Sequence, residues 1–583
     1  MNLTILVTIL ILVAFYIGIG LLNKNGRLPG FISLQFPMIL LQSERGKPTI
    51  HYVADRFERF WKIWGFLGVV LTGIGLVLGG LLVTLSAIQV LSNPTTATLT
   101  SDPKNLLVIP GLNDYLPLSA APAIIIALLI GMIVHELGHA ILCRVGDIEI
   151  ESTGIVFLSL IPAGAFVQPN EESNSEATNW ARIRMISGGI MNNLAISLIC
   201  LLCLILLVSS VSPVSGGAVG GITQDSPANE STLEQGDVIT EVNGISIDSN
   251  SELTQTFDNI SQSQLRIQTK SGENHTIERQ PFVVSSPRFG SELNTGDRIL
   301  QVGEREVRTQ NHFISVLNKV QSNTVPIKTQ NNTIVYPVGA RGIAEENSKF
   351  ARQFENTPRV IIYQIEETRI HSSYDLENYL SSANQKQNVT IQAAPISNPE
   401  QVKSIQINIR ESEIGMQPVE GYSGVVTSDN GITVYPTETY LRILSNNTTN
   451  GWASLLSTMG LLLVLPLASL IGFQFNFAGF TPEISNFVTV NGLFSQFPSI
   501  LLFVISVLYW TIWLNINLAL FNAIPTFALD GGKYAKITYE STVKKIGVNN
   551  PTKISNILTK ITIYAMLICL LIVALYPYLS RSI

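Results

Sequence analysis

The 583-residue sequence contains few charged residues and very few cysteines. Charged residues make up 13% of the chain and the formal net charge is only −6, which argues against nucleic acid as a main partner. All four cysteines lie in or beside apolar runs, at Cys143, Cys200, Cys203 and Cys569. The large polar region has none, so no disulfide framework can stabilise it, and cysteine usage does not define a redox compartment.

Hydrophobic residues, by contrast, make up 46% of the chain and gather in long runs. A helix of about twenty apolar residues crosses about 30 Å of hydrocarbon. We expect crossings near residues 3–22, 64–92, 119–143, 184–212, 499–525 and 555–579. The first run lacks a basic leader and a small-residue cleavage site, which favours a retained anchor over a removed signal peptide. A further segment, 452–476, contains Gly460, Pro466 and Gly472 and predicts a bent hairpin or an interfacial element. The expected fold class is a polytopic α-helical membrane protein with about six or seven transmembrane helices.

A polar insert, residues 213–450, contains a unit that occurs three times. The copies begin at Asp237 (DVITEVNGISIDSNSEL), Asp297 (DRILQVGEREVRTQNHF) and Val360 (VIIYQIEETRIHSSYDL), 60 and 63 residues apart. Each pattern predicts a strand, a turn, a short strand and a helix start. The aligned apolar positions are Ile239, Val242, Ile247 and Leu253, then Ile299, Val302, Val307 and Phe313, then Ile362, Ile365, Ile370 and Leu376. Such regular spacing predicts three small α/β modules.

The first copy resembles the start of a PDZ domain. It follows GGAVGGITQDSPANESTLEQGD, Gly216–Asp237, in which a glycine-containing loop leads into a strand and GDVI opens the next one. The second copy is less similar, and the third is similar only in its pattern. PDZ domains bind an extended peptide as an added strand, so the resemblance implies peptides or C-terminal tails as ligands. The alternative is that the modules only space or shield the membrane part.

The distribution of basic residues predicts the orientation. Residues 23–63 contain seven Lys or Arg residues and residues 531–553 contain five lysines, so both segments are expected to be cytoplasmic. The insert contains seven Asn-x-Ser/Thr sequences, which fit an extracytoplasmic face. We therefore expect the insert outside the cell membrane, or outside the cytoplasm at an internal membrane if the organism is a eukaryote.

The apolar run IIIALLIGMIVHELGHAILCRVG, Ile124–Gly146, contains an H-E-x-x-H motif. Ionisable side chains within a bilayer are costly and usually functional. The spacing places His135 and His139 one helical turn apart on one face, where both can bind one metal ion. Glu136 can take a proton from metal-bound water and pass it to a leaving amine. The alternative is a polar trio that joins neighbouring helices. The other histidines are expected to be solvated: His51, His275, His312 and His371.

A catalytic zinc site needs a third protein ligand and an open position. The segment NAIPTFALDGGK, Asn522–Lys533, follows the apolar run at 499–525 and places Asp530 near the end of that helix. Gly531 and Gly532 allow a tight turn or a close helix contact. Taken alone, the letters LDGG are typical of an ordinary helix-to-loop turn.

Together, the two segments resemble the site-2 protease family of intramembrane zinc metalloproteases. The family motif N-x-x-P-x-x-x-L-D-G is matched at Asn522, Pro525, Leu529, Asp530 and Gly531. The resemblance implies a Zn²⁺ cofactor with His135, His139 and Asp530 as ligands, and Glu136 as general base and then general acid. The stretches PAGAFV and NAIPTFALDG are more similar to a eukaryotic or archaeal-like branch than to the bacterial one.

A third family element, small-Gly-Pro-x-x-Asn, is matched by SGGIMNN, Ser187–Asn193, although Gly189 stands where the family has proline. By resemblance, Asn192 would hydrogen-bond the oxyanion or the substrate backbone. The neighbouring Asn193 could do the same, and close helix packing by the small residues is a further alternative.

The segment GIVFLSLIPAGAFVQP, Gly154–Pro169, is too short and too broken by glycine and proline for a normal crossing. It resembles the membrane re-entrant element of the family, which borders the active site and could pair with an extended substrate. An ordinary amphipathic loop fits the pattern equally well.

The hypothesis we adopt is an intramembrane zinc metalloendopeptidase that cuts within or near the transmembrane segments of membrane-anchored proteins. Its partners would be such substrates and the lipid bilayer. The expected parts are an N-terminal membrane region at residues 1–118, the first half of the catalytic core at 119–212, and the insert with its PDZ-like repeats at 213–450. A membrane-associated hairpin or extra helix is expected at 451–498, and the second half of the core with a C-terminal helix at 499–583. The alternatives are a catalytically inactive scaffold that binds peptides through the insert, and a transporter, for which inverted repeats are lacking.

Overall fold

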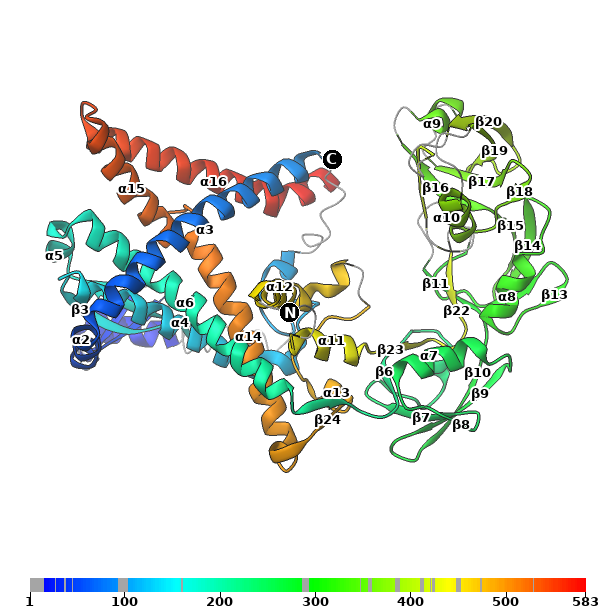
Figure 1. Ribbon diagram of the computed structural model, residues 1–583, viewed down its shortest axis with the longest axis horizontal. Helices are drawn as coiled ribbons and strands as arrows, with labels where there is room; N and C mark the ends of the chain where they lie inside the picture. The colour runs from blue at the N-terminus through cyan, green and yellow to red at the C-terminus, as the bar shows by residue number, and fades with distance from the viewer. Residues whose placement is uncertain are drawn as a thin grey trace. The chain divides into compact units, whose positions relative to one another are not determined.

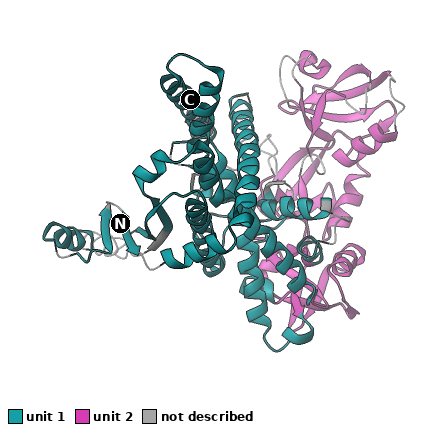
Figure 2. Cartoon of the chain, turned by 60° about the vertical axis from the view of Figure 1, so that its left-hand side comes forward, with its two compact units in different colours: residues 1–212, 438–485, 490–583 teal, residues 213–437, 486–489 magenta. Residues whose placement is uncertain are grey.

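The computed structural model describes residues 15–582 except 27, 36–37, 44–45, 93–102, 159–160, 286–292, 346–347, 355–358, 383–387, 409–413, 420, 422–424, 447–451, 472–473 and 528. The chain forms two compact units (Figure 2). Unit 1 comprises Met1–Ser212, Glu438–Ser485 and Val490–Ile583, and unit 2 comprises Pro213–Thr437 and Asn486–Thr489.

Unit 1 is built around long apolar helices (Figure 1). Five helices in the described part of the chain are long and apolar enough to cross a membrane. They are α3 (Glu58–Ser92), α4 (Ala121–Val145), α6 (Asn179–Val208), α14 (Pro498–Ala523) and α16 (Pro551–Ser582). They match five of the predicted crossings, and most of the first predicted crossing, 3–22, lies outside the described residues. The chain is therefore an integral membrane protein with several apolar helices and a separate sheet-rich unit.

The described part of the segment 452–476 is bent beside its proline, and Gly472 lies outside the described residues. Helix α12 (Trp452–Val464) passes into a 3₁₀ segment, Leu465–Ile471, in which the φ of −122° at Leu467 interrupts the helix. Proline at 466 cannot donate a helical hydrogen bond, which explains a break at this point. Short helices lie on either side, α11 (Thr437–Leu444) and α13 (Pro482–Ser485).

A four-stranded antiparallel sheet also belongs to unit 1. Its strands occur in the order β1 (Ile32–Gln35), β2 (Met38–Ser43), β3 (Ile150–Leu158) and β4 (Ile161–Pro169). The segment 154–169 is thus a strand hairpin with Thr153 opposite Val167, and neither an ordinary loop nor a helix. The remaining helices of unit 1 are α2 (Lys47–Arg56), α5 (Glu171–Glu176) and α15 (Asp530–Ile546). Short strands β5 (Val211–Pro213) and β24 (Val488–Val490) lie where the chain passes between the units.

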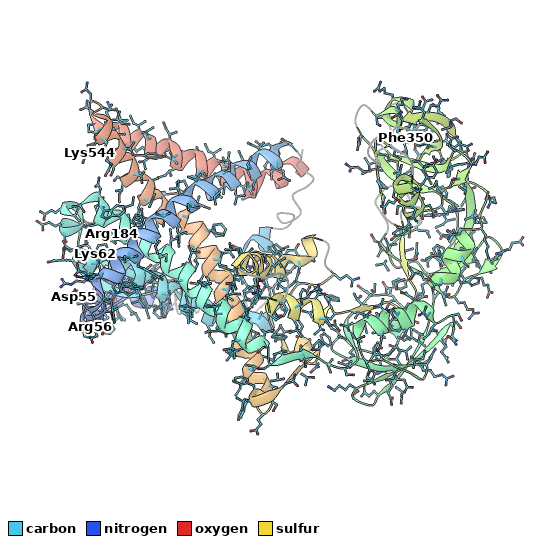
Figure 3. The ribbon with its side chains drawn as sticks, viewed as in Figure 1. Asp55, Arg56, Lys62, Arg184, Phe350 and Lys544 are labelled. Carbon is cyan, nitrogen blue, oxygen red and sulfur yellow. The ribbon has the colours of Figure 1, made fainter. Side chains whose placement is uncertain are left out.

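Unit 2 contains the three predicted modules, each with two strands, a short strand, a helix and two further strands, and the third has an additional helix, α9, between its first two strands. The first comprises β6 (Gly217–Ile222), β7 (Val238–Val242), β8 (Ile245–Ser246), α7 (Asn250–Asn259), β9 (Gln264–Thr269) and β10 (Asn274–Glu278). The second comprises β11 (Phe282–Ser285), β12 (Ile299–Val302), β13 (Arg305–Glu306), α8 (Gln310–Leu317), β14 (Thr324–Thr329) and β15 (Thr333–Pro337). The third comprises β16 (Ala340–Ala344), α9 (Lys349–Gln353), β17 (Arg359–Ile365), β18 (Thr368–Arg369), α10 (Ser373–Ser382), β19 (Asn388–Pro395) and β20 (Lys403–Asn408). Phe350 belongs to the core of the third module (Figure 3).

The repeat is confirmed by its cores and its helix caps. All twelve aligned apolar residues are at most 3% exposed. The module helices begin at equivalent hydroxyl side chains, because Ser249, Thr309 and Ser372 each accept a hydrogen bond from the backbone N–H three residues later. The same local sequence signal therefore starts the helix in each module.

Two histidines of the insert are not solvated, and that expectation was wrong. His275 is 3% exposed and its Nδ1 lies 2.9 Å from Thr232 Oγ1. His371 is 8% exposed and its Nε2 lies 3.0 Å from the carbonyl oxygen of Val320. One nitrogen of each ring has a hydrogen-bond partner, which compensates for burial at that atom.

Candidate metal centre

Glycines bring the helix with the HExxH motif against α6. A Cβ on Gly138 would overlap the carbonyl of Gly188, and a Cβ on Gly188 would lie 2.5 Å from the carbonyl oxygen of Gly138. The two helices therefore cross at backbone contact, as small residues permit inside membranes. A Cβ on Gly189 would lie 2.5 to 2.7 Å from atoms of both histidine rings. This glycine, which replaces the family's proline, leaves the room that the two rings occupy.

The two glycines of the LDGG motif allow a similarly close backbone contact beside Asp530. Helix α14 ends at Ala523, and α15 begins at Asp530. A Cβ on Gly531 would overlap the carbonyl of Ala523, and a Cβ on Gly532 would overlap that of Thr526. The start of α15 can therefore pack closely against the end of α14, and Asp530 lies next to α4.

The structure brings the three predicted ligands together although Asp530 is 395 residues from His135 in sequence. His135 Nε2 lies 3.2 Å from Asp530 Oδ2, and His139 Nε2 lies 3.1 Å from the same oxygen. The two Nε2 atoms are 3.1 Å apart. His135 is 9% exposed and Asp530 is 5% exposed, so the cluster is shielded from bulk water.

The other nitrogen of each ring has a partner suited to metal binding at Nε2. His139 Nδ1 lies 2.9 Å from the carbonyl oxygen of Met185, which can only accept, so Nδ1 carries the proton and Nε2 has the free lone pair. His135 Nδ1 lies 3.2 Å from Asn193 Nδ2, while the buried Asn193 Oδ1 has no partner. Amide oxygen and nitrogen are assigned from the hydrogen-bond network, and exchanging them lets Oδ1 accept from His135 Nδ1–H, which leaves the lone pair of His135 Nε2 free for a metal ion.

This donor set fits a zinc ion. A tetrahedral Zn²⁺ with ligands at about 2.0–2.1 Å holds neighbouring ligand atoms roughly 3.3–3.4 Å apart. The three observed separations, 3.1 to 3.2 Å, are close to that value. Two imidazole lone pairs and a carboxylate repel one another at such distances unless a cation or a proton lies between them. His135, His139 and Asp530 can therefore hold zinc with a fourth position left open.

Glu136 lies beside this trio. Its ligand oxygen and the ligand nitrogens of His135 and His139 all lie within 4.8 Å of one another. Its Oε2 accepts a hydrogen bond of 2.9 Å from the backbone N–H of Val167 on β4. Strand β4 therefore holds the carboxylate next to the ligand atoms. From the sequence, only the family resemblance indicated that this segment borders the site.

A cavity of about 740 Å³ opens onto the cluster. The three candidate ligands and Glu136 line it, together with apolar side chains of α4, α6 and α14, further polar and charged side chains such as Arg182 and Lys536, and a continuous stretch of β4. This stretch runs from Gly164 to Pro169. Lys533 also lines it, and its Nζ lies 3.2 Å from Asp530 Oδ1, which leaves Oδ2 directed at the histidines. A concave site in which polar groups converge beside apolar side chains is the usual place for a ligand.

The side chain of Asn192 joins neighbouring helices, whereas that of Asn193 contacts His135. Its Nδ2 donates to the carbonyl of Val134 at 3.0 Å, and its Oδ1 accepts from Trp64 Nε1 at 2.9 Å. The side chain therefore joins α3, α4 and α6, and its action on a substrate stays a prediction. The contact of Asn193 with His135 was not predicted, because two adjacent asparagines on a helix give no sequence signal for which one faces the site.

The fold and the site define a class, a polytopic membrane protein with a HExxH metal-ligand cluster inside its helix bundle. The model of "Peptidase family M50" matches residues 123–569. The chain belongs to this family, the site-2 protease family, whose members are zinc-dependent membrane metalloproteases.

An uncharacterized protein of Methanocaldococcus jannaschii is 30% identical to the chain over 210 residues. The match covers 36% of this chain and 53% of the other, so the chain spans about half the length of that relative. Its description assigns no activity, and the similarity supports the family alone.

Proposed function

We propose that this protein is an intramembrane zinc endopeptidase that hydrolyses peptide bonds within or near the membrane-spanning segments of membrane-anchored proteins. The observation that carries the proposal is the convergence of His135, His139 and Asp530 beside Glu136 in a cavity lined by both polar and apolar side chains. Zinc bound there supplies an activated water and polarises the scissile carbonyl. Neither the scaffold nor the transporter hypothesis explains why an acid–base residue stands beside a complete ligand set.

Glu136 is suited to move the proton. One carboxylate oxygen is fixed by Val167 N–H, which holds the group beside the two histidines. The carboxylate would take a proton from the attacking water as the water oxygen bonds to the carbonyl carbon. It would deliver this proton to the leaving nitrogen as the C–N bond breaks. Its role requires proximity and orientation, both of which the hydrogen bond supports.

The outer edge of β4 offers a place for the substrate. β4 is the terminal strand of its sheet, and its edge lines the same cavity as the ligands. Val167 directs its N–H outward to Glu136, so Ala165, two residues away, also presents its backbone to the cavity. An unpaired strand edge binds an extended chain by main-chain hydrogen bonds. A helical substrate would have to unwind here, which exposes the amide that is to be cut.

The charges of unit 1 support a site near the cytoplasmic face. Lys62, Arg184 and Lys544, from three different helices, lie at the same end of unit 1 (Figure 3). Arg144 is five residues after His139 on α4, about 8 Å along the helix axis. By the positive-inside rule this end faces the cytoplasm, so the cut would fall inside the membrane near that face. The insert would then be extracytoplasmic, where its PDZ-like modules would exclude proteins with bulky outer domains.

The test is cleavage of a tagged single-span protein by the purified full chain in liposomes, with zinc content measured in each sample. Glu136→Gln should lose cleavage and keep its zinc, whereas Asp530→Ala should lose both. Glu241→Gln, at an acidic residue of the insert, is the matched control and should cut like the wild type. Cleavage that persists in Glu136→Gln would contradict the proposal, and wild-type protein without zinc would favour the scaffold hypothesis.

A further inference from the structure

After the third module come the described residues 414–419, 421 and 425–436, which we call the return segment. It contains three short strands, β21 (Met416–Pro418), β22 (Val426–Ser428) and β23 (Ile432–Val434). β21 pairs with β16 of the third module, β22 with β11 of the second, and β23 with β6 of the first, all antiparallel. The return segment therefore pairs with the three modules in the reverse of their order along the chain.

In each module the return segment covers the same edge. β6 and β16 would be terminal strands of their sheets without it, since the strand orders end in β7-β6-β23 and β17-β16-β21. The second module is equivalent: Val283 exchanges backbone bonds with Gly296 and Asp297, as Val219 does with Gly236 and Asp237. The covered strand is always the first of its module. An open edge of this kind is a template for an added strand.

The first strands of the modules approach the backbone of the return segment closely. Gly342 of β16 could not be replaced by a larger residue, because its Cβ would lie 2.6 Å from the carbonyl oxygen of Gln417. On β6, Thr223 N–H donates to Gly431 at 2.9 Å, and Tyr435 N–H donates to Ala218 at 3.0 Å. These hydrogen bonds continue the ladder on both sides of the paired residues.

A buried ion pair fixes the return segment between the first two modules. Asp429 Oδ2 lies 2.7 Å from Arg279 Nη2, and both side chains are 3% exposed. The same oxygen accepts the backbone N–H of Gln310 at 2.6 Å, at the start of α8. A buried carboxylate needs such compensation, so this position of the return segment is specific.

We propose that the return segment is the resident strand ligand of the insert. It occupies, within the same chain, the first-strand edges to which strand-adding modules bind extended peptides. A tethered ligand acts at an effective concentration in the millimolar range, so a free tail binds these edges only after the return segment has left. This inference concerns unit 2 and does not depend on the metal chemistry.

The test measures binding of a fluorescent peptide with the sequence of residues 425–436, VVTSDNGITVYP, to the full chain in detergent. Thr433 lies opposite Gly221, midway between two residues that bond to β6, so its N–H also points at that strand. Thr433→Pro removes this donor, whereas Thr433→Val keeps it and is the matched control. We expect the proline variant to bind the peptide at least about tenfold more tightly than wild type, and the valine variant to match wild type. Equal affinity of wild type and Thr433→Pro would overturn the proposal.

Hydrogen exchange of the wild-type chain gives a second readout that requires no variant. The amides of Gly221 and Thr223 should exchange as slowly as those of the central strand β7. Exchange as fast as in an exposed loop would overturn the proposal. If Thr433→Pro also loses protection in β9 and β10, Gln417→Pro replaces it, with a peptide of residues 414–419 and Gln417→Ala as its control. The side chain of Gln417 is exposed, so only its backbone is tested.

Discussion

Replacement of Gly189 by alanine tests whether the close approach of α6 sets the geometry of the ligand cluster. The added Cβ would lie 2.5 Å from His135 Cε1, 2.6 Å from His139 Nε2 and 2.7 Å from His135 Nε2. The shortest of these falls about 0.9 Å short of the 3.4 Å at which ordinary contact begins. Either the rings or α6 must move by most of that distance.

Neither movement is compatible with intact ligation. Metal sites tolerate about 0.2 Å in ligand distances. A shift of α6 would also withdraw Asn193 and the carbonyl of Met185 from the two rings, and loss of such outer partners typically costs 10- to 100-fold in metal affinity. We therefore expect Gly189→Ala to weaken zinc binding by about 100-fold or more. Gly460→Ala is the matched control, because its Cβ meets nothing within 4 Å.

The assay is a competition titration of the purified chain against a fluorescent zinc chelator, together with the melting temperature. Overpacking of this kind costs about 1–3 kcal/mol of stability, so the variant should remain folded and the two effects can be separated. A folded Gly189→Ala protein with the zinc affinity of Gly460→Ala would refute the reasoning, since the rings would then have room that the structure does not show.

Three further changes probe residues with distinct contacts. Asn193→Leu should lower the zinc affinity about 10- to 100-fold, whereas Asn193→Asp keeps an acceptor and should retain most of the affinity. Equal losses for the two variants in the chelator titration would contradict the assigned hydrogen bond. Trp64→Phe removes the donor to Asn192 and should destabilise the membrane unit by about 1 kcal/mol in thermal unfolding without changing zinc affinity. Asp429→Asn leaves Arg279 buried without its counter-ion and should destabilise the insert by about 3–5 kcal/mol in denaturant unfolding, and an unchanged midpoint would show that the pair is dispensable.

Features with a short-range signal could be predicted from the sequence. The HExxH spacing fixes one helical face, and the aligned apolar residues of the three modules all lie in cores. The bend near Pro466 follows from its missing donor. The proximity of Asp530 to the histidines followed from family resemblance, because no local pattern connects residues 395 positions apart.

What the sequence did not reveal depends on contacts between distant segments. The hairpin 154–169 is short and rich in glycine and proline, so its strand character becomes clear only through its pairing with β2. The return segment has no pattern of its own, and its strands are three residues long. The burial of His275 likewise depends on Thr232, 43 residues away. The direction of Asn193 depends on how α6 is rotated against α4.

The masses of both products show whether the cluster cuts peptide bonds inside the membrane. A single-span substrate would be reconstituted in liposomes with the wild-type chain or with Glu136→Gln, and the products identified by mass spectrometry. We expect one pair of products from the wild type only, with the new ends inside the apolar segment on its cytoplasmic half. A cut confined to the soluble flanks, or the same products from Glu136→Gln, would rule out intramembrane proteolysis by this site.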